Sequence, residues 1–356
     1  MAKRRDNFGA LRLAAATAVL VSHGFGLTGR TDPVWPLAGQ MLGDVAVAVF
    51  FAISGFLVVG SWCRDPNLRR FAGRRARRIW PGLTAAVLIT AYVIGPLFTG
   101  LPLTHYLTSG GPQDYVAGKL LMLPVDPRLP GVFTSNPLAA ANSSLWTLPV
   151  EVKAYVLVAV LGLLGAFRRR WCVWAAWLLC VELVVLSAKF NFGSVAGFWP
   201  RETYLFAVFL GGAVLYRERE RIPLRAGLAA ALIAVWLLSS GTPAQVPMGA
   251  AAIPYACLWL AYRTRPVLVR LVERADLSYG IYLYSYPVEQ GIRAALGRAA
   301  TPLVTIALAL PITVALAFGS WELVEKRWLR RGRPRDLSPA EPASSVLVAP
   351  AETRVS

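Results

Sequence analysis

Long runs of apolar residues separated by short polar segments dominate the chain. Residues 226–262 contain no charged side chain and are divided only by Gly241-Thr242-Pro243. A helix needs about 17–25 mostly apolar residues to cross a bilayer, so this run predicts two spans joined by a tight turn. Read in the same way, the whole pattern predicts ten spanning helices, over residues 9–29, 41–62, 79–98, 144–166, 171–188, 202–216, 225–240, 247–262, 277–296 and 301–323.

The distribution of charge supports this helix count. The 356 residues include 37 Lys and Arg but 19 Asp and Glu, and 56% of the chain is hydrophobic. If the N-terminus is placed in the cytoplasm, the cytoplasmic segments hold roughly four times as many Lys and Arg residues as the outer ones, as the positive-inside rule requires. We therefore expect an all-α polytopic membrane protein with about ten transmembrane helices and both termini cytoplasmic.

The net charge of +18 is then mainly a topology signal, and nucleic-acid binding is not expected. The cysteines are few and scattered, and the chain has two histidines. Neither a disulfide framework nor a metal site is therefore predicted. Residues 1–330 are expected to form one transmembrane domain. The segment 331–356, rich in Pro, Ala and Ser, is expected to be a disordered cytoplasmic tail. In the outer segment, residues 115–123 are expected to form a re-entrant or surface helix.

Ionisable side chains inside spans are costly and are therefore functional candidates. They are Arg12, His23, Asp44, Glu151, Lys153, Glu182, Glu289 and Glu322. Arg12 and His23 are eleven residues apart, close to three helical turns, so they share a face of one helix with a rise of about 16 Å between them. Either can have a simpler role, because Arg12 can reach back to the cytoplasmic surface and His23 can line a helix contact.

Two carboxylates are expected near the depth of His23. Asp44 begins the second predicted helix and Glu151 lies in the first half of the fourth, and both helices run from outside to inside. A carboxylate beside a histidine raises its basicity and fixes its tautomer, as in general-base sites. Asp44 can alternatively cap its helix, and Glu151 can pair with Lys153.

The densest charge on the chain is a run of seven arginines between residues 64 and 78. Such a run can anchor the topology through lipid headgroups. It can also bind phosphate, because guanidinium groups match phosphate oxygens bidentately. Tyr279 and Tyr282 belong to a tyrosine-rich part of the ninth predicted helix, which either packs or lines a polar cavity.

Six short motifs, in order over residues 7–330, resemble the membrane acyltransferase 3 superfamily of bacterial integral-membrane O-acyltransferases. The first pairs Arg12 with His23 across ten residues. The others are Phe50-Phe51-Ala52-Ile53-Ser54-Gly55-Phe56-Leu57, the Arg-x-x-Arg segment of Arg75 and Arg78, Ser144-Leu145-Trp146-Thr147-Leu148-Pro149-Val150-Glu151 followed by Tyr155, Leu277-Ser278-Tyr279-Gly280-Ile281-Tyr282-Leu283-Tyr284, and Glu322-Leu323-Val324-Glu325-Lys326.

The resemblance implies transfer of an acyl group, usually acetyl, from cytoplasmic acyl-CoA to a hydroxyl, with no bound cofactor. Arg12, Arg75 and Arg78 would hold the donor phosphates. His23 would act as a direct base or carry the acyl group covalently, and Asp44 or Glu151 would orient it. The residues expected to line the cavity are Ser54, Trp146, Tyr155, Tyr279 and Tyr282.

The acceptor expected from the resemblance is a cell-surface glycan or its lipid-linked precursor. The expected location is the bacterial cytoplasmic membrane, which the chain crosses several times. Two other functions remain open from the sequence. One is O-acylation of a secondary-metabolite sugar such as that of a macrolide. The other is a non-catalytic transporter or flippase of glycan or lipid, because intramembrane charges suit that role as well.

Overall fold

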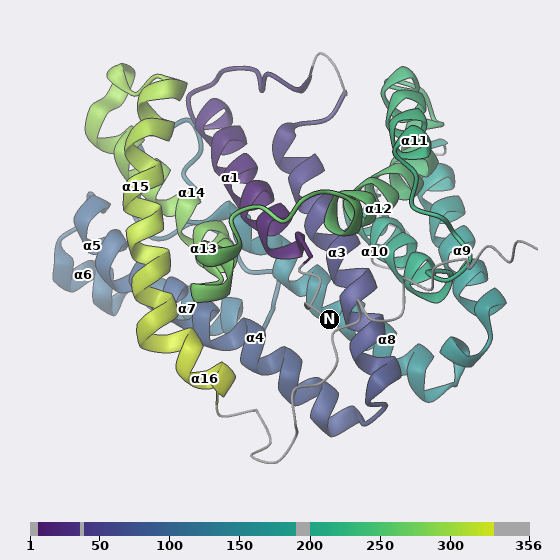
Figure 1. Ribbon diagram of the computed structural model, residues 1–356. Coiled ribbons are helices and arrows are strands. Elements are labelled where there is room, and N and C mark those ends of the chain that lie inside the picture. The colour runs from purple at the N-terminus through teal and green to yellow at the C-terminus, as the bar shows by residue number, and fades with distance from the viewer. Residues whose placement is uncertain (1–5, 36–38, 190–199, 331–356) are drawn as a thin grey trace, which may run out of the picture.

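The chain folds into a bundle of helices (Figure 1), and the computed structural model describes residues 6–35, 39–189 and 200–330. No β-strand occurs in these three ranges. The helices are α1 (Phe8–Gly26), α3 (Leu42–Arg64), α4 (Leu68–Ile89), α5 (Gly95–Phe98), α6 (Leu103–Thr108), α7 (Gly111–Leu120), α8 (Thr147–Leu163), α9 (Arg170–Lys189), α10 (Pro200–Arg217), α11 (Ala226–Leu238), α12 (Gln245–Arg263), α13 (Val269–Arg274), α14 (Leu277–Leu296), α15 (Pro302–Ser320) and α16 (Lys326–Arg330).

Each predicted span coincides, in order, with one of these helices, and the predicted all-α membrane class is confirmed. Within the described residues, six helical segments are long and apolar enough by themselves to cross a bilayer, namely Phe8–Gly26, Leu42–Arg64, Leu68–Phe98, Ser143–Leu163, Arg170–Ser187 and Pro302–Arg330. The remaining predicted spans correspond to α10, α11, α12 and α14, which are shorter or less apolar. The expected tail, 331–356, lies outside the described residues.

The third predicted span begins eleven residues earlier than its apolar run suggests. Asn67 caps α4, because its side chain accepts a hydrogen bond of 3.0 Å from the amide of Arg70. Arginine and alanine are good helix formers, so the polar residues that follow continue directly into the apolar run. A π-helical segment, Thr90–Ile94, then joins α4 to α5. The arginine run is therefore mostly helical, and the helix fixes the direction in which each arginine side chain leaves the backbone.

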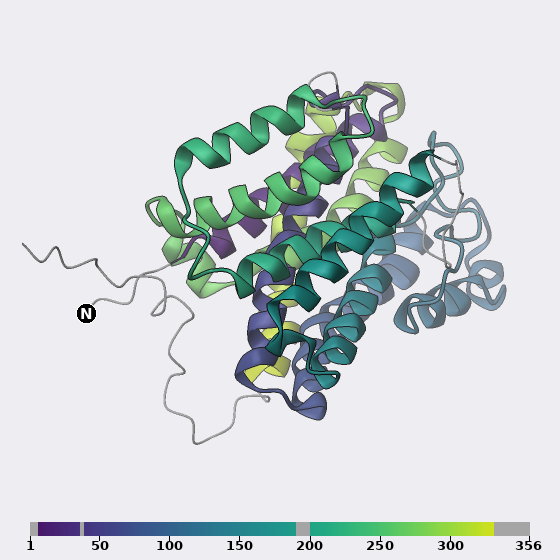
Figure 2. The ribbon, with the colours of Figure 1, turned by 90° about the vertical axis from the view of Figure 1, so that its right-hand side faces the viewer.

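The bundle is arranged around α1 and α3. In Figure 1, α14 and α15 lie on one side of α1, while α9, α10, α11 and α12 lie on the other side of α3. Figure 2 shows the helices of the second group crossing in front of α3. Glycines allow the closest contact, because a Cβ on Gly55 of α3 would lie 1.8 Å from the carbonyl oxygen of Phe209 on α10. The pair α3 and α10 thus packs backbone against backbone.

The expected helix over 115–123 corresponds to α7, which begins earlier, at Gly111. Its Tyr115 is buried, and the indole of Trp80 on α4 donates a hydrogen bond of 3.0 Å to the carbonyl of Leu120. The helix is therefore attached to the bundle near the middle of α4.

Candidate active site

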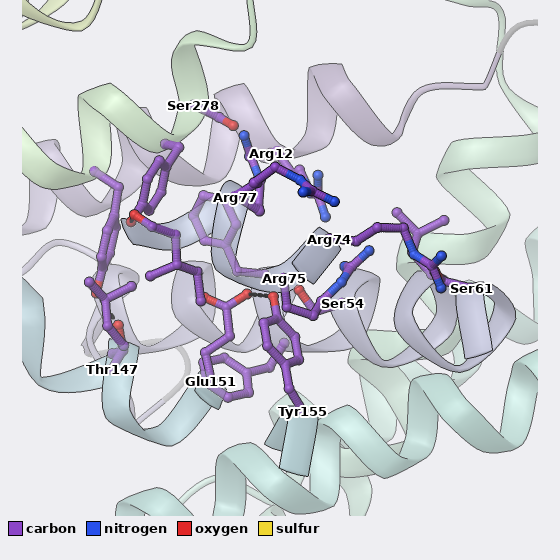
Figure 3. A pocket seen from close by; sticks show the side chains of 18 of the residues that line it. Arg12, Ser54, Ser61, Arg74, Arg75, Arg77, Thr147, Glu151, Tyr155 and Ser278 are labelled. Carbon is purple, nitrogen blue, oxygen red and sulfur yellow. Dashed lines mark hydrogen bonds between the residues drawn. The ribbon is translucent and has the colours of Figure 1, made fainter. Parts of the chain in front are cut away.

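A cavity of about 530 Å³ opens among α1, α3, α4, α8 and α14 at the arginine-rich end of the bundle. The three arginines expected to bind the donor, Arg12, Arg75 and Arg78, all line it, together with Arg64, Arg74 and Arg77. Figure 3 shows Arg12 and Arg75 facing the same space from α1 and α4. The structure therefore brings together residues that lie more than sixty positions apart in the sequence.

The guanidinium groups of this cavity differ in their partners. Arg74 pairs with Asp65 at 2.6 Å, and Arg78 pairs with Asp276 at 2.8 Å. Within the described ranges, Arg12 and Arg75 form no ion pair with a carboxylate. Arg75 instead packs over the ring of Tyr155, with 5.6 Å from its guanidinium carbon to the ring centroid. Arg12 and Arg75 thus keep their charge available for an anion in the cavity.

The two carboxylates that hold arginines in place stay ionised at neutral pH. Hydrogen bonds from Arg70 and Arg74 lower the pKa of Asp65 to about 2. Burial by itself would raise the pKa of Asp276, but the charges of Arg78 and Arg12, with hydrogen bonds from Ser278, hold that pKa below its ordinary value. Both acids therefore position guanidinium groups without titrating near pH 7.

The cavity is closed, at the end away from the arginine run, by a pair of hydroxyl groups. The hydroxyls of Thr147 and Tyr282 lie 2.5 Å apart, and Tyr282 donates to the carbonyl of Ser144 at 2.5 Å. One turn further along α14, Tyr286 meets the ring of His23 edge to face, with centroids 5.0 Å apart. His23 therefore lies just beyond the end of the cavity, on the same helix as Arg12.

The carboxylate that faces His23 is Glu289. His23 Nδ1 lies 3.7 Å from Glu289 Oε2, the Glu289 side chain is fully buried, and the His23 side chain is 24% exposed. Neither carboxylate oxygen of Glu289 has a hydrogen-bond partner in the described part of the chain. An unpaired buried carboxylate is costly, so its placement against the imidazole is a feature that needs a functional reason.

The expected orienting residues, Asp44 and Glu151, do not contact His23. Asp44 forms an ion pair with Arg201. Glu151 accepts a hydrogen bond from the hydroxyl of Tyr155, four residues along α8, and lines the arginine-rich cavity. The rotation of α3 and α8 turns these acids toward other partners. Lys153, the alternative partner of Glu151, contacts Glu202 at 3.0 Å.

Four of the five residues expected to line the cavity do so, namely Ser54, Tyr155, Tyr279 and Tyr282. The fifth, Trp146, does not. It lies under the guanidinium group of Arg201, 5.2 Å from ring centroid to carbon, and borders a separate cavity of about 580 Å³. It is the last residue of a 3₁₀ turn, Ser143–Trp146, that precedes α8.

Glu289 was included among the intramembrane acids but was not singled out by its sequence. A signal was nevertheless present, because Tyr282, Tyr286 and Glu289 follow the spacing i, i+4, i+7 and thus share one face of α14. Among the described residues, no group of three His, Cys, Asp or Glu side chains could hold a metal ion. The chemistry available at the site is that of an imidazole, a carboxylate and an arginine-lined cavity.

A family model described as an acyltransferase domain matches residues 5–322. The chain belongs to the membrane acyltransferase 3 family. This acyltransferase is 27% identical over 335 residues to the "O-acetyl transferase" of Shigella phage Sf6, which covers 92% of the chain and 97% of that protein. It is 29% identical over 360 residues to "Nodulation protein 10" of Rhizobium leguminosarum bv. viciae, covering 90% of the chain and 92% of that relative. No solved structure matches it.

The comparisons confirm the resemblance read from the six motifs and establish the chain as an integral-membrane transferase of acyl groups. They cover both ends of the described bundle, so the arginine-lined cavity and His23 both lie within the matched domain. A non-catalytic transporter or flippase is therefore set aside as the function of this acyltransferase.

Proposed function

We propose that this acyltransferase moves an acetyl group from acetyl-CoA to a hydroxyl of a cell-surface glycan or of its lipid-linked precursor. The observation that carries the proposal is the arrangement along α14. Tyr282 lines the arginine-rich cavity, and Tyr286, one turn further, meets the ring of His23. Glu289 then lies 3.7 Å from the same imidazole. The positive-inside rule favours a cytoplasmic arginine-rich end, in the cytoplasmic membrane of a bacterium, where acyl-CoA is present.

The donor enters the cavity with its nucleotide phosphates among the arginines. Arg12 and Arg75, which no carboxylate neutralises in the described structure, bind the phosphate oxygens, and Arg78 adds its charge from the pair with Asp276. The thin pantetheine arm then extends toward Tyr282. The rise of about 16 Å along α1 from Arg12 to His23 is the distance that this arm has to cover.

His23 acts as the base in the transfer step. Its imidazole takes the proton from the acceptor hydroxyl while the hydroxyl oxygen attacks the thioester carbonyl. The tetrahedral intermediate then collapses, the carbon–sulfur bond breaks, and the leaving CoA thiolate receives the proton from the imidazolium. The products are the ester and free CoA. A thioester is an activated acyl donor, so the chain's own residues need only bind, orient and move one proton.

Glu289 is the positioning residue for His23. Its carboxylate lies 3.7 Å from Nδ1, beyond hydrogen-bond distance but near enough for its charge to favour the tautomer with the proton on Nδ1. The other ring nitrogen, Nε2, is then left to accept the proton of the acceptor. The carboxylate also stabilises the imidazolium that forms during the transfer. Acetyl as the transferred group is supported by the name of the Shigella phage relative, an "O-acetyl transferase".

The test is transfer of labelled acetyl from acetyl-CoA by membranes that contain the chain, followed by mass spectrometry of surface glycans from cells with and without it. We expect label in a glycan or lipid-linked fraction and a glycan mass lower by one acetyl group in cells that lack the chain. Label confined to a small secreted molecule, or no thioester consumption at all, would overturn the proposal.

A further inference from the structure

A second hollow lies on the far side of the His23–Glu289 pair from the donor cavity. This groove has a volume of about 800 Å³ and is formed by the end of α1, the end of α14 and the start of α15. Phe25, two residues after His23, lines it. Arg293, one turn beyond Glu289 on α14 and so about 6 Å further along the axis, lines it as well. The groove therefore lies close to the base, on the side opposite to the donor cavity.

The groove is positively charged and contains no acid. Arg30, Arg293 and Arg298 all line it, no Asp or Glu does, and none of the three arginines forms an ion pair with a described residue. Arg293 donates a hydrogen bond to the carbonyl of Gly297. The helix α15 also begins here, at Thr301 and Pro302, and the positive end of its dipole adds to the same potential.

The acid nearest to Arg30 in the sequence is engaged elsewhere. Asp32 is buried and accepts hydrogen bonds from the hydroxyl of Ser22 at 2.5 Å, from the amide of Val34 at 2.9 Å and from the amide of Leu42 at 3.0 Å. It fixes the segment that follows α1 and leaves the charge of Arg30 facing the groove. The arginines thus gather in one hollow with no built-in counter-charge.

Topology does not explain these arginines. In the proposed orientation they lie on the outer side, where the positive-inside rule leaves few basic residues. Three like charges around one hollow repel each other, so their convergence is a cost that a bound anion removes. Guanidinium groups bind phosphate bidentately, and three of them with a helix N-terminus suit a group with more than one negative charge.

The surroundings of the groove indicate how such an anion is presented. Leu303, at its rim, is 74% exposed, and the exposed residues Leu308 and Ile312 follow on α15. This apolar face meets the hydrocarbon of the bilayer directly below the arginines. A molecule that carries phosphate at the membrane surface and a hydrocarbon chain below it fits both features.

We propose that Arg30, Arg293 and Arg298 form a binding site for the phosphate or diphosphate of a lipid-anchored acceptor, which holds the acceptor's hydroxyl beside His23. The proposal rests on the proposed function, because the bound molecule is taken to be the acceptor of the acyl group. It narrows the substrate class to glycans presented on a phosphorylated lipid. Phospholipid headgroups share the same chemistry, and the experiment separates the two sources.

The experiment measures binding of farnesyl diphosphate to the full chain in phosphatidylcholine nanodiscs, with no acetyl-CoA present. The variant is Arg30→Gln/Arg293→Gln/Arg298→Gln, and the matched control is Arg128→Gln, an exposed outer arginine that pairs with Asp126 away from the groove. We expect the triple variant to raise the Kd for farnesyl diphosphate at least tenfold, with binding of CoA unchanged. The control should keep the wild-type Kd. Farnesol, which lacks the diphosphate, should bind the wild type and both variants with the same Kd.

If the triple variant is poorly folded, as judged by its CoA binding, Arg298→Gln alone serves, because Arg298 is exposed and its replacement should still raise the Kd severalfold. A Kd within twofold of wild type in the folded variants would overturn the proposal. So would full displacement of farnesyl diphosphate by phosphatidylglycerol in the nanodisc, because the groove would then be a headgroup site. The experiment measures binding and not acetyl transfer. Its outcome is therefore independent of whether the proposed acetyl transfer is observed.

Discussion

At the scale of single residues, the decisive contact is that between His23 and Glu289. The histidine lies next to Tyr286 and is 24% exposed, whereas the acid is fully buried. A buried carboxylate without hydrogen bonds lowers the stability of a fold. In the proposed mechanism, its position 3.7 Å from Nδ1 gives that cost a purpose, because the carboxylate orients the imidazole.

Replacement of His23 by alanine is expected to lower the acetyl-transfer rate by about 10²–10⁴, the usual contribution of a general base. CoA binding should persist, because the donor arginines lie elsewhere. The control is His105→Ala, an exposed histidine on α6, which should keep the wild-type rate. Labelled acetyl transfer normalised to chain abundance measures both. A His23→Ala variant that keeps more than a tenth of the rate would rule out the catalytic assignment.

Glu289→Gln is expected to lower kcat by less than the loss of His23 does, with little change in the donor KM, because the amide keeps the shape but not the charge. The shape of the pH–rate profile should also change, since the imidazolium loses its counter-charge. Asp44→Asn is the matched control and should keep both the rate and the profile, because Asp44 contacts Arg201. A wild-type pH–rate profile in Glu289→Gln would show that Glu289 only packs against His23.

At the scale of elements, α4 is the part that turns a charged run into a binding surface. Because Asn67 caps the helix ahead of the arginines, those three and four residues apart share faces. Arg70 meets Asp65 at the exposed start of the helix, and Arg74 both pairs with Asp65 and lines the cavity. Arg75 and Arg78 line the cavity as well, so one run of arginines serves both the exposed start of the helix and the cavity.

The double variant Arg75→Ala/Arg78→Ala is expected to raise the KM for acetyl-CoA at least tenfold, because a hydrogen bond to a charged group contributes roughly 1.5–3 kcal/mol. Arg75→Ala alone should raise it in the same direction while leaving the pair of Arg78 with Asp276 intact. The control is Arg69→Ala/Arg70→Ala, two exposed positions on the same helix. An unchanged donor KM in the double variant would leave the run with only a topological role.

Close contact between α3 and α10 gives a second test at this scale. A Cβ on Gly55 would lie 1.8 Å from the Phe209 carbonyl oxygen, which no side-chain rotation can relieve. Gly55→Ala is therefore expected to cost about 1–3 kcal/mol, as overpacking does in cores, and to lower the thermal midpoint of the detergent-solubilised chain. Gly227→Ala, which meets no atom within 4 Å, should leave the midpoint unchanged or higher. Equal thermal midpoints for the two variants would contradict the close backbone contact that we assign to the α3–α10 interface.

At the scale of the whole molecule, the two hollows open on opposite ends of α1, and His23 lies between them. This arrangement lets a donor and an acceptor approach from the two sides of a membrane without sharing an entrance. Which hollow faces the cytoplasm depends on the orientation of the chain in the membrane. The excess of basic residues at one end of the bundle predicts that orientation.

Cysteine accessibility tests the orientation. In a background without Cys63, Cys172, Cys180 and Cys257, a probe at Asn67→Cys should react with a membrane-impermeant reagent only after cells are permeabilised. A probe at Ser135→Cys, exposed at the opposite end, should react in intact cells. Ser135 lies in a connecting segment, whereas Asn67→Cys removes the N-cap of α4, a loss of about 0.5–2 kcal/mol that leaves the apolar spans and their orientation in place. Labelling of Asn67→Cys in intact cells would reverse the topology and the direction of acyl transfer.

The sequence by itself determined the class of fold, the order of the helices and the residues able to carry chemistry. Hydrophobic runs and basic clusters are read along the chain, and in a bilayer they fix which segments are helical and which ends face which side. The spacing of Arg12 and His23 on one helix is local in the same sense. These features needed no partner helix to be recognised.

Tertiary structure alone decided which carboxylate meets His23, and it placed Trp146 outside the donor cavity. The sequence gives the depth of a residue in the membrane, but not the rotation of its helix or the identity of its neighbour. Those depend on side-chain fit, such as the contact of Gly24 on α1 with Ile306 on α15, where a Cβ would lie 2.6 Å from the isoleucine side chain. That fit brings Glu289 on α14 to His23 and leaves Asp44 and Glu151 with Arg201 and Tyr155.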